Sequence, residues 1–248
     1  MGRLTEAIKH LIIINVLFFI AGITGLGDTL YEYLALWFPE NPNFQWWQVV
    51  SHMFLHDFSG FFHILFNMYA LWAFGSPLER MWGRNKFLFF YFSAGIGAAL
   101  IHTVANYYFF SQGVEIIQAT GLSEARIIEI LSSGKYSPDW YTLASQGTID
   151  SFMSAFNAPA VGASGAVYGV LVAFAFMFPN AELMLIFLPV PIKAKYFVPL
   201  IILGDIIFGF SNVNTGIAHF AHVGGALIGF IMMWYWKRNQ FNQNRWDN

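Results

Sequence analysis

The chain has 248 residues, of which 57% are hydrophobic and only 10% are charged, whereas a soluble domain carries about 25% charged residues. This composition excludes an ordinary soluble enzyme and indicates a protein embedded in a lipid bilayer. The absence of cysteine excludes disulfides, thiolate metal sites and a cysteine nucleophile. The net charge of −2 says little by itself. We expect no nucleic-acid partner.

Six segments are apolar enough to cross a hydrocarbon layer of about 30 Å, which takes about 20 residues in a helix. The expected spans are residues 9–27, 60–78, 86–110, 161–178, 194–210 and 216–237. We therefore expect an all-α, six-helix bundle that forms one membrane domain over residues 1–248. No convincing cleavage site follows the first span, so we expect a retained helix and not a signal peptide.

The connections between the spans differ in character. Residues 28–59 are rich in Trp, Phe and Tyr, which favours a loop that lies on or dips into the membrane interface. Residues 111–160 are polar, and one short helix is predicted there between the N-cap Ser123 and Gly134. We expect this insertion to be extramembrane and loosely attached. Four prolines in residues 179–199 predict a partly inserted, non-helical piece.

The basic residues predict the orientation of the bundle. With a cytoplasmic N-terminus, the cytoplasmic segments hold ten Lys and Arg residues and the outer segments hold only Arg126 and Lys135. This positive-inside bias places both termini in the cytoplasm. We expect a multi-pass protein of a bacterial inner membrane whose site opens toward the outer side.

Polar residues inside the spans need a reason, because a charged side chain at a helix centre costs roughly 2.5–3.5 kcal/mol. The polar residues expected within the spans are His63, Asn67, His102, Ser164, Asp205, His219 and His222. At 1.5 Å per residue, His63, Asn67, Ser164 and His222 all fall within about 10 Å of the outer end of the hydrocarbon zone. They come from three separate spans, and this convergence is what a catalytic site requires.

The residue types suggest hydrolysis by an activated serine. Ser164 could serve as the nucleophile and His222 as the base that takes its proton. The side chains of His63 and Asn67, with the backbone N–H of Ser164, could stabilise an oxyanion. Tyr168, one turn after Ser164, could press its ring on the imidazole of His222.

Glycines surround these residues at the points where two helices would have to approach closely. Gly162 and Gly165 clear space beside Ser164, and Gly224, Gly225 and Gly229 would let the sixth span pack against the fourth. A serine among small residues also fits plain helix packing, which is the alternative for Ser164 taken alone.

Three motifs resemble those of the rhomboid intramembrane serine proteases. They are "HILFNM" (63–68), "GASGAVYG" (162–169) and "AHFAHVGG" (218–225), on the second, fourth and sixth expected spans. The resemblance covers about residues 10–110 and 160–237. The G-x-S-G piece alone would be weak, but the three motifs in this order and at this depth are highly specific.

The resemblance implies a function and a role for each residue. Ser164 and His222 would form a catalytic dyad without an essential carboxylate, and His63, Asn67 and the Ser164 amide would line the oxyanion hole. Tyr168 would pack on the base. The partners would be transmembrane proteins, cut within the bilayer near the outer ends of their membrane segments, with no cofactor and no metal.

The chain departs from the rhomboid pattern in three places. Trp47 is followed by Gln48 where rhomboids usually carry arginine, which puts the bracing of the first loop by that residue in doubt. The interval from His56 to His63 is about two residues longer than usual. The loop over residues 111–160 is also larger than in compact members.

Other readings of the polar residues remain open. Asp205 could orient the base as in a triad, but we favour a structural hydrogen bond to a neighbouring helix. The spacing of His52, His56 and His63 invites a zinc hypothesis, which the lack of an H-E-x-x-H motif disfavours.

Two other functions compete with proteolysis. A non-catalytic rhomboid-like protein would bind or escort membrane helices, but such relatives typically lose the serine or the histidine. A transporter would need polar groups through the whole bilayer thickness, whereas here they gather on the outer side, with the depth of Asp205 less certain.

Overall fold

The computed structural model describes residues 4–185, 188–211 and 215–243, and this part of the chain is mostly helical. In chain order the helical elements are α1 (Glu6–Ala21), η1 (Gly22–Leu26), α2 (Gly27–Leu34), α3 (Gln48–Ser51), η2 (His52–Phe54), α4 (Phe61–Ala70), η3 (Leu71–Gly75), α5 (Ser76–Trp82), α6 (Arg84–Gln118), α7 (Glu124–Ser132), η4 (Pro138–Thr142), α8 (Gln146–Asn157), α9 (Ser164–Met177), α10 (Ala194–Phe210) and α11 (His219–Gln243). Strands β1 (Glu182–Leu185) and β2 (Leu188–Lys193) form an antiparallel pair between α9 and α10.

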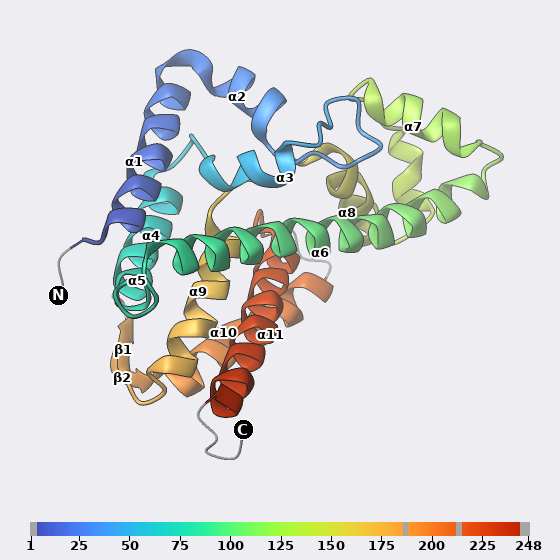
Figure 1. The fold of residues 1–248 in the computed structure, drawn as a ribbon. Coiled ribbons are helices and arrows are strands. Elements are labelled where there is room, and N and C mark those ends of the chain that lie inside the picture. The colour runs from blue at the N-terminus through green and yellow to red at the C-terminus, as the bar shows by residue number, and fades with distance from the viewer. Residues whose placement is uncertain (1–3, 186–187, 212–214, 244–248) are drawn as a thin grey trace.

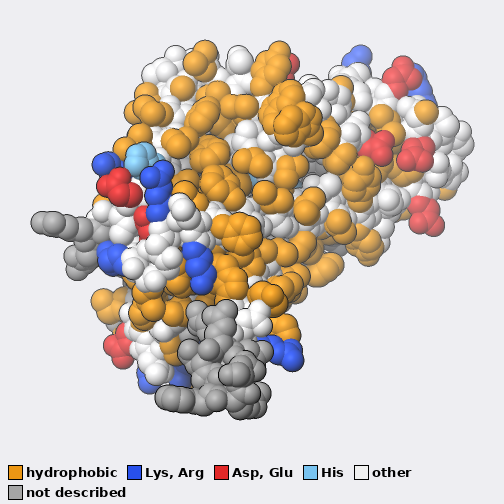
Figure 2. All heavy atoms as spheres, viewed as in Figure 1, with side chains coloured by type: hydrophobic (Ala, Val, Ile, Leu, Met, Phe, Trp, Pro, Cys, Tyr) orange, Lys and Arg blue, Asp and Glu red, His pale blue; other side chains and the backbone are white. Residues whose placement is uncertain are grey.

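The elements divide into two ends with a hydrophobic zone between them. The start of α1, α5, the strand pair and the end of α11 lie together at the lower left of Figure 1, whereas α2, α7 and α8 lie toward the top and right. Figure 2 shows that charged side chains gather at these two ends and that the surface between them is mostly hydrophobic. A broad apolar surface bounded by charge is what a bilayer requires of the protein it surrounds.

The six expected spans are confirmed only in part. Among the described residues, Glu6–Leu34 and Arg84–Gln118 are long and apolar enough to cross a membrane, and Ser164–Met177 is a shorter apolar helix. The segment expected at 60–78 lies, after its first residue, within one uninterrupted helical run, in which α4, the π-helical turn η3 and α5 follow one another directly. The six-span arrangement therefore stays a prediction, although the expected segment 194–210 coincides with α10.

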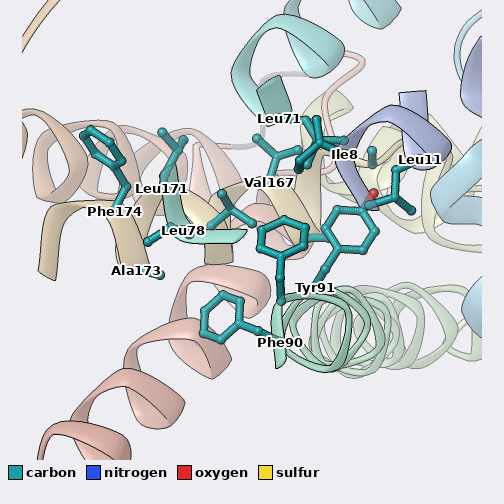
Figure 3. Packing of buried hydrophobic residues seen from close by; sticks show 14 of the residues in the cluster. Ile8, Leu11, Leu71, Leu78, Phe90, Tyr91, Val167, Leu171, Ala173 and Phe174 are labelled. Carbon is teal, nitrogen blue, oxygen red and sulfur yellow. The ribbon is translucent and has the colours of Figure 1, made fainter. Parts of the chain in front are cut away.

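A buried hydrophobic cluster holds the helices together (Figure 3). It is built mainly from α1, the α4–α5 region, α6 and α9, with fully buried members that include Ile8, Leu71, Leu78, Phe90, Tyr91 and Val170. In lipid the burial of apolar surface gives little net drive, so close side-chain packing of this kind carries much of the association.

A buried carboxylate fixes the start of α1 against α5. Glu79, on α5, accepts hydrogen bonds from the backbone N–H groups of Ala7 (2.8 Å) and Ile8 (3.1 Å) and from the hydroxyl of Thr5. The first N–H groups of a helix have no partner within it, and a negative charge there complements the helix dipole. Glu79 thus caps α1 and ties it to α5.

Helices α9 and α11 meet along four glycines, Gly165, Gly169, Gly225 and Gly229, which we call the α9–α11 seam. A Cβ atom added to Gly225 would lie 1.8 Å from the carbonyl oxygen of Gly165. One added to Gly229 would lie 2.7 Å from the Cα of Gly169. The two backbones are therefore in contact, which brings the start of α9 next to the first turns of α11.

Residues 111–160 are not loosely attached, and this expectation was wrong. Helix α6 continues to Gln118, so its 35 residues extend for about 52 Å. Helices α7 and α8 pack on this extension around a second buried cluster, whose fully buried members are Ile117, Ile127, Leu131, Ile149, Phe152 and Phe156. The predicted N-cap is confirmed, because Ser123 Oγ accepts a hydrogen bond from the N–H of Arg126.

The proline-rich link before α10 is non-helical, as predicted, but it has regular structure. Strands β1 and β2 pair with Glu182 opposite Lys193. The backbone N–H of Ala194 then donates to the carbonyl of Ala181 (2.8 Å), which closes the strand pair at the start of α10.

Candidate active site

The structure brings Ser164 and His222 together at the end of the α9–α11 seam where both helices begin. Ser164 is the first residue of α9, and His222 lies one turn into α11. His222 Nε2 lies 2.9 Å from Ser164 Oγ, within hydrogen-bonding distance. The N–H of Ser164 is among the first of α9, so it has no partner within the helix.

Asp205 occupies the other side of the His222 ring. Its Oδ1 atom lies 3.0 Å from His222 Nδ1, and the carboxylate is buried, with 7% of the residue exposed. Because a carboxylate accepts hydrogen bonds, His222 carries a proton on Nδ1 and presents the lone pair of Nε2 to Ser164. Asp205 does bond to a neighbouring helix, as expected, but its partner is the histidine assigned as the base.

Tyr168 lies flat against the same imidazole. The two ring centroids are 4.2 Å apart and the rings are nearly parallel, at 10°. The tyrosine hydroxyl also interacts with the carboxylate of Asp205. His222 is therefore held on its face by Tyr168 and on its edge by Asp205.

A second histidine extends this arrangement toward the loop before α11. His219 Nδ1 lies 2.6 Å from Asp205 Oδ1, and its Nε2 lies 2.7 Å from the hydroxyl of Thr215. Thr215, His219, Asp205, His222 and Ser164 thus form a continuous hydrogen-bonded series, which we call the polar chain. The sequence did not predict the place of His219 in it.

The polar chain also contains a possible metal-ligand group. Asp205, His219 and His222 are the one set of three such residues within the described segments whose ligand atoms all lie within 4.8 Å of one another. However, Asp205 Oδ1 already accepts from both histidines, so the group is complete as a hydrogen-bonded network.

His63 faces the site from α4. The backbone N–H of Asp57 donates to His63 Nδ1 (3.3 Å), so the neutral ring carries its proton on Nε2. A Cβ atom at Gly162 would lie 3.0 Å from His63 Nε2 and 3.5 Å from Ser164 Oγ. Gly162 has a φ of 127°, which strongly favours glycine, and its lack of a side chain keeps this space open.

Asn67 joins the site through His63. Its buried side-chain nitrogen donates to the carbonyl oxygen of His63 (2.9 Å), one turn earlier on α4. This bond uses one of its two N–H donors. The structure thus brings both Ser164 and Tyr168 against His222. Asn67 bonds to His63, which borders the space beside Gly162 that Ser164 Oγ also borders.

Gln48 braces the first loop at the position where rhomboids usually have arginine. Its fully buried side chain accepts from the N–H of Trp37 (3.3 Å) and donates to the carbonyl of Asn43 (2.8 Å). The carbonyl of Gln48 accepts from His52 Nδ1 (2.8 Å), and the carbonyl of His52 accepts from the N–H of Gly162 (3.0 Å). The first loop is therefore tied to the start of α9.

Two histidines of the first loop are buried as neutral groups. Burial lowers the pKa of His52 to about 4. Burial, together with the nearby His63, lowers the pKa of His56 to about 3. The ring of His56 meets that of His63 edge to face, with centroids 5.0 Å apart, and His52, His56 and His63 do not form a metal-ligand group within the described residues.

Comparison with known proteins identifies the family. The Rhomboid domain matches residues 43–133 and 134–239. The chain is 28% identical over 237 residues to the presenilin-associated rhomboid-like protein, mitochondrial, of Homo sapiens, covering 93% of this chain and 47% of that protein. It is 25% identical over 190 residues to rhomboid protein 1, mitochondrial, of Saccharomyces cerevisiae, covering 75% and 41%. Over 95 residues it is 33% identical to the rhomboid protease GluP of Bacillus subtilis, covering 37% and 18%.

These relatives also bear on the location of the protein. The chain spans less than half the length of the mitochondrial relatives that it matches. Because the relatives that cover most of the chain are mitochondrial, the expectation of a bacterial inner membrane is not supported. The Rhomboid domain accounts for most of the sequence, and the chain is a membrane protein that belongs to the rhomboid family.

Proposed function

We propose that this protein is a serine endopeptidase that cuts transmembrane segments of other proteins within the bilayer. One observation carries the proposal, the 2.9 Å contact between His222 Nε2 and Ser164 Oγ. A serine hydroxyl becomes a useful nucleophile when a base at this distance takes its proton. This chain keeps both the serine and the histidine, whereas a non-catalytic escort is expected to have lost one of them.

In the first half of the proposed reaction, Ser164 Oγ attacks the scissile carbonyl carbon and its proton passes to His222 Nε2. The negative charge that develops on the substrate oxygen faces His63 Nε2–H and the Ser164 N–H, with the remaining N–H of Asn67 as a third donor. The imidazolium then gives its proton to the leaving amine, which leaves an ester on Ser164.

In the second half, a water molecule replaces the amine. His222 takes a proton from the water as the oxygen attacks the ester carbon, and the proton returns to Ser164 Oγ when the ester breaks. The net change is one peptide bond hydrolysed by one water. Every proton moves between substrate, water and side chains of this chain, and the scheme uses no cofactor or metal.

We propose further that Asp205 is a positioning residue for His222. Its Oδ1 fixes the ring with Nδ1 protonated and lowers the free energy of the imidazolium that forms during catalysis. This extends the dyad that the motifs imply, and it rests on the 3.0 Å contact between Asp205 and His222.

The substrate class and orientation follow from the surroundings of the site. The starts of α9 and α11, which carry Ser164 and His222, lie away from the end of the molecule at which α5, the strand pair and the end of α11 meet (Figure 1). That end carries Arg80, Arg84, Lys86, Lys193, Lys195, Lys237 and Arg238. By the positive-inside rule we assign it to the inner face, so the pair acts near the outer face, on the outer part of membrane helices.

The test uses Ser164→Ala and His222→Ala beside wild type, with a model transmembrane substrate and a fluorophosphonate probe. We expect wild type to cleave the substrate and to be labelled, and both variants to lose cleavage while inserting normally into the membrane. Labelling of Ser164→Ala at the wild-type rate would show a different nucleophile. Wild type that binds the substrate helix without labelling or cleavage would favour the escort function.

Asp205→Asn tests the positioning role separately. The amide can donate to Nδ1 and so favours the wrong tautomer, and we expect the cleavage rate to fall by about 10²-fold or more. A merely structural role would lower the amount of folded protein and leave unchanged the pH profile of the protein that remains. Cleavage near the wild-type rate with an unaltered pH profile would refute the role of Asp205.

A further inference from the structure

A groove runs between α9, α10 and α11 on the hydrophobic surface of the protein. Its volume is about 680 Å³. Each helix contributes residues from one face, at intervals of three or four, except that Lys237 follows Phe230 on α11 after seven residues. On α10 and α11 these include Val198, Ile202, Ile206, Val223, Leu227 and Phe230. The groove is therefore a continuous apolar channel that is parallel to the helices and opens toward lipid.

One end of the groove is basic. Lys195, in the first turn of α10, and Lys237, near the end of α11, both line it. The two helices run in opposite directions, so both lysines lie at the same end, the end that also holds the strand pair (Figure 1). Within the described part of the chain, the residues that line the groove include no acidic side chain. An occupant that suits the groove therefore has a long apolar part and an anionic head.

We propose that this groove binds an anionic phospholipid, with its phosphate at Lys195 and Lys237 and an acyl chain along the apolar channel. Basic sites between membrane helices on the inner face suit anionic headgroups. From Lys195 to Ile206 the channel extends for about 16 Å along α10. An extended acyl chain matches such a narrow apolar channel, and the two lysines at one end complement a phosphate.

The outer end of the groove lies next to the polar chain. Ile206 follows Asp205 on α10, and Val223 follows His222 on α11. An acyl chain in the groove fills the space between α10 and the two helices of the seam. It therefore supports the position of Asp205 beside His222. The importance of this support for catalysis rests on the proposed function, whereas the proposal of lipid binding does not rest on it.

The test measures lipid binding in the Ser164→Ala protein, so its result does not depend on catalysis. The protein is reconstituted in vesicles of phosphatidylcholine with or without phosphatidylglycerol, extracted gently, and examined by native mass spectrometry for retained lipid. We expect phosphatidylglycerol to be retained at least about fivefold over its share of the vesicle. Lys195→Gln/Lys237→Gln should remove this preference.

A matched control removes the same charge from the same end. Lys193 and Arg238 are neighbours of the two lysines but do not line the groove, and the Arg238 guanidinium lies over the ring of Trp234. Lys193→Gln/Arg238→Gln should keep the preference. Equal loss in both double variants would show a general surface-charge effect and overturn the proposal.

Two further outcomes would also overturn the site. Equal retention of both lipids by the Ser164→Ala protein would show that the groove does not select an anionic head. A dimer or a substrate complex without bound lipid would show a protein occupant. In protein with Ser164 intact, retention of lipid without cleavage would leave this site standing and count against the proposed function.

Discussion

Helices α9 and α10 pack against α11 in different ways. Helix α9 meets α11 backbone to backbone through the seam glycines. Helix α10 meets the same pair with an open groove of about 680 Å³ between them. The proposed nucleophile and base lie on the tightly packed pair, whereas the carboxylate of Asp205 lies on the helix with space beside it.

The α9–α11 interface is therefore suited to holding a fixed geometry, whereas the interface with α10 can adjust. Protein interiors transmit strain because they are closely packed, so the seam can hold the 2.9 Å Ser164–His222 contact only in one arrangement. Helix α10 has several strongly exposed residues, among them Leu200 at 60% and Leu203 at 53%. If the groove holds a lipid as proposed, the position of α10, and with it that of Asp205, depends more on this occupant.

The largest effect is expected from Gly225→Ala, which attacks the seam directly. The new methyl group would lie 1.8 Å from the Gly165 carbonyl oxygen, and backbone atoms cannot yield as a flexible side chain does. We expect a loss of several kcal/mol in the free energy of unfolding, read as loss of monodisperse protein in detergent. In any protein that still folds, fluorophosphonate labelling should fall at least about 100-fold, because Ser164 and His222 are forced apart.

A folded Gly225→Ala protein with wild-type labelling would show that the seam does not set the distance between nucleophile and base.

A smaller effect is expected at the ring that lies on the base. Tyr168→Leu removes the parallel contact with His222, and an aromatic pair is worth about 0.5–1.5 kcal/mol. We expect about tenfold slower cleavage, measured as kcat/KM. Tyr168→Phe keeps the ring and loses only the hydroxyl near Asp205, so it serves as the control and should lose less. If Phe is as harmful as Leu, the hydroxyl matters and the stacking does not.

The sequence predicted the site residues on α9 and α11 better than it predicted the contacts of α10. Ser164, His222 and the glycines stand out because polar or minimal side chains interrupt apolar helices, and that signal is local. The partners of Asp205 depend on how α10 is rotated and placed against α11, which hydrophobic periodicity does not specify in a helix that is apolar on nearly every face.

The connections follow the same logic. Ser123 and the short helix after it were predictable from capping chemistry. The packing of α7 and α8 on α6 was not, because it joins residues as distant as Ile117 and Phe156. The bonds of Gln48 with Trp37 and Asn43 were also missed, since they depend on the path of the first loop.

The protein should become less stable in acid around the end of the α9–α11 seam that holds Ser164 and His222. The buried histidines His52 and His56 have pKa values of about 4 and about 3, below the ordinary 6.5 that each regains on unfolding. Between pH 6.5 and about 4 the unfolded chain binds more protons, so the stability falls as the pH falls. The slope should approach about 1.4 kcal/mol per pH unit for each histidine.

Thermal unfolding in detergent between pH 7.5 and 5 measures this slope. His56→Leu removes one of the two groups and should reduce the slope by the share of one histidine, up to about 1.4 kcal/mol per pH unit. Stability that does not change over this range would show that the two histidines are not held neutral in the folded protein.

The smallest effect is expected from Gly204→Ala. It is the same glycine-to-alanine change as Gly225→Ala, but on α10 and outside the seam. No atom lies within 4 Å of a Cβ at Gly204, and the position lies inside a helix, where alanine is favoured over glycine by up to about 1 kcal/mol. We expect unchanged cleavage and a melting temperature equal to or slightly above that of wild type. Loss of cleavage by Gly204→Ala in folded protein would mean that α10 is positioned as strictly as α9, and the division of tasks between the two interfaces would fail.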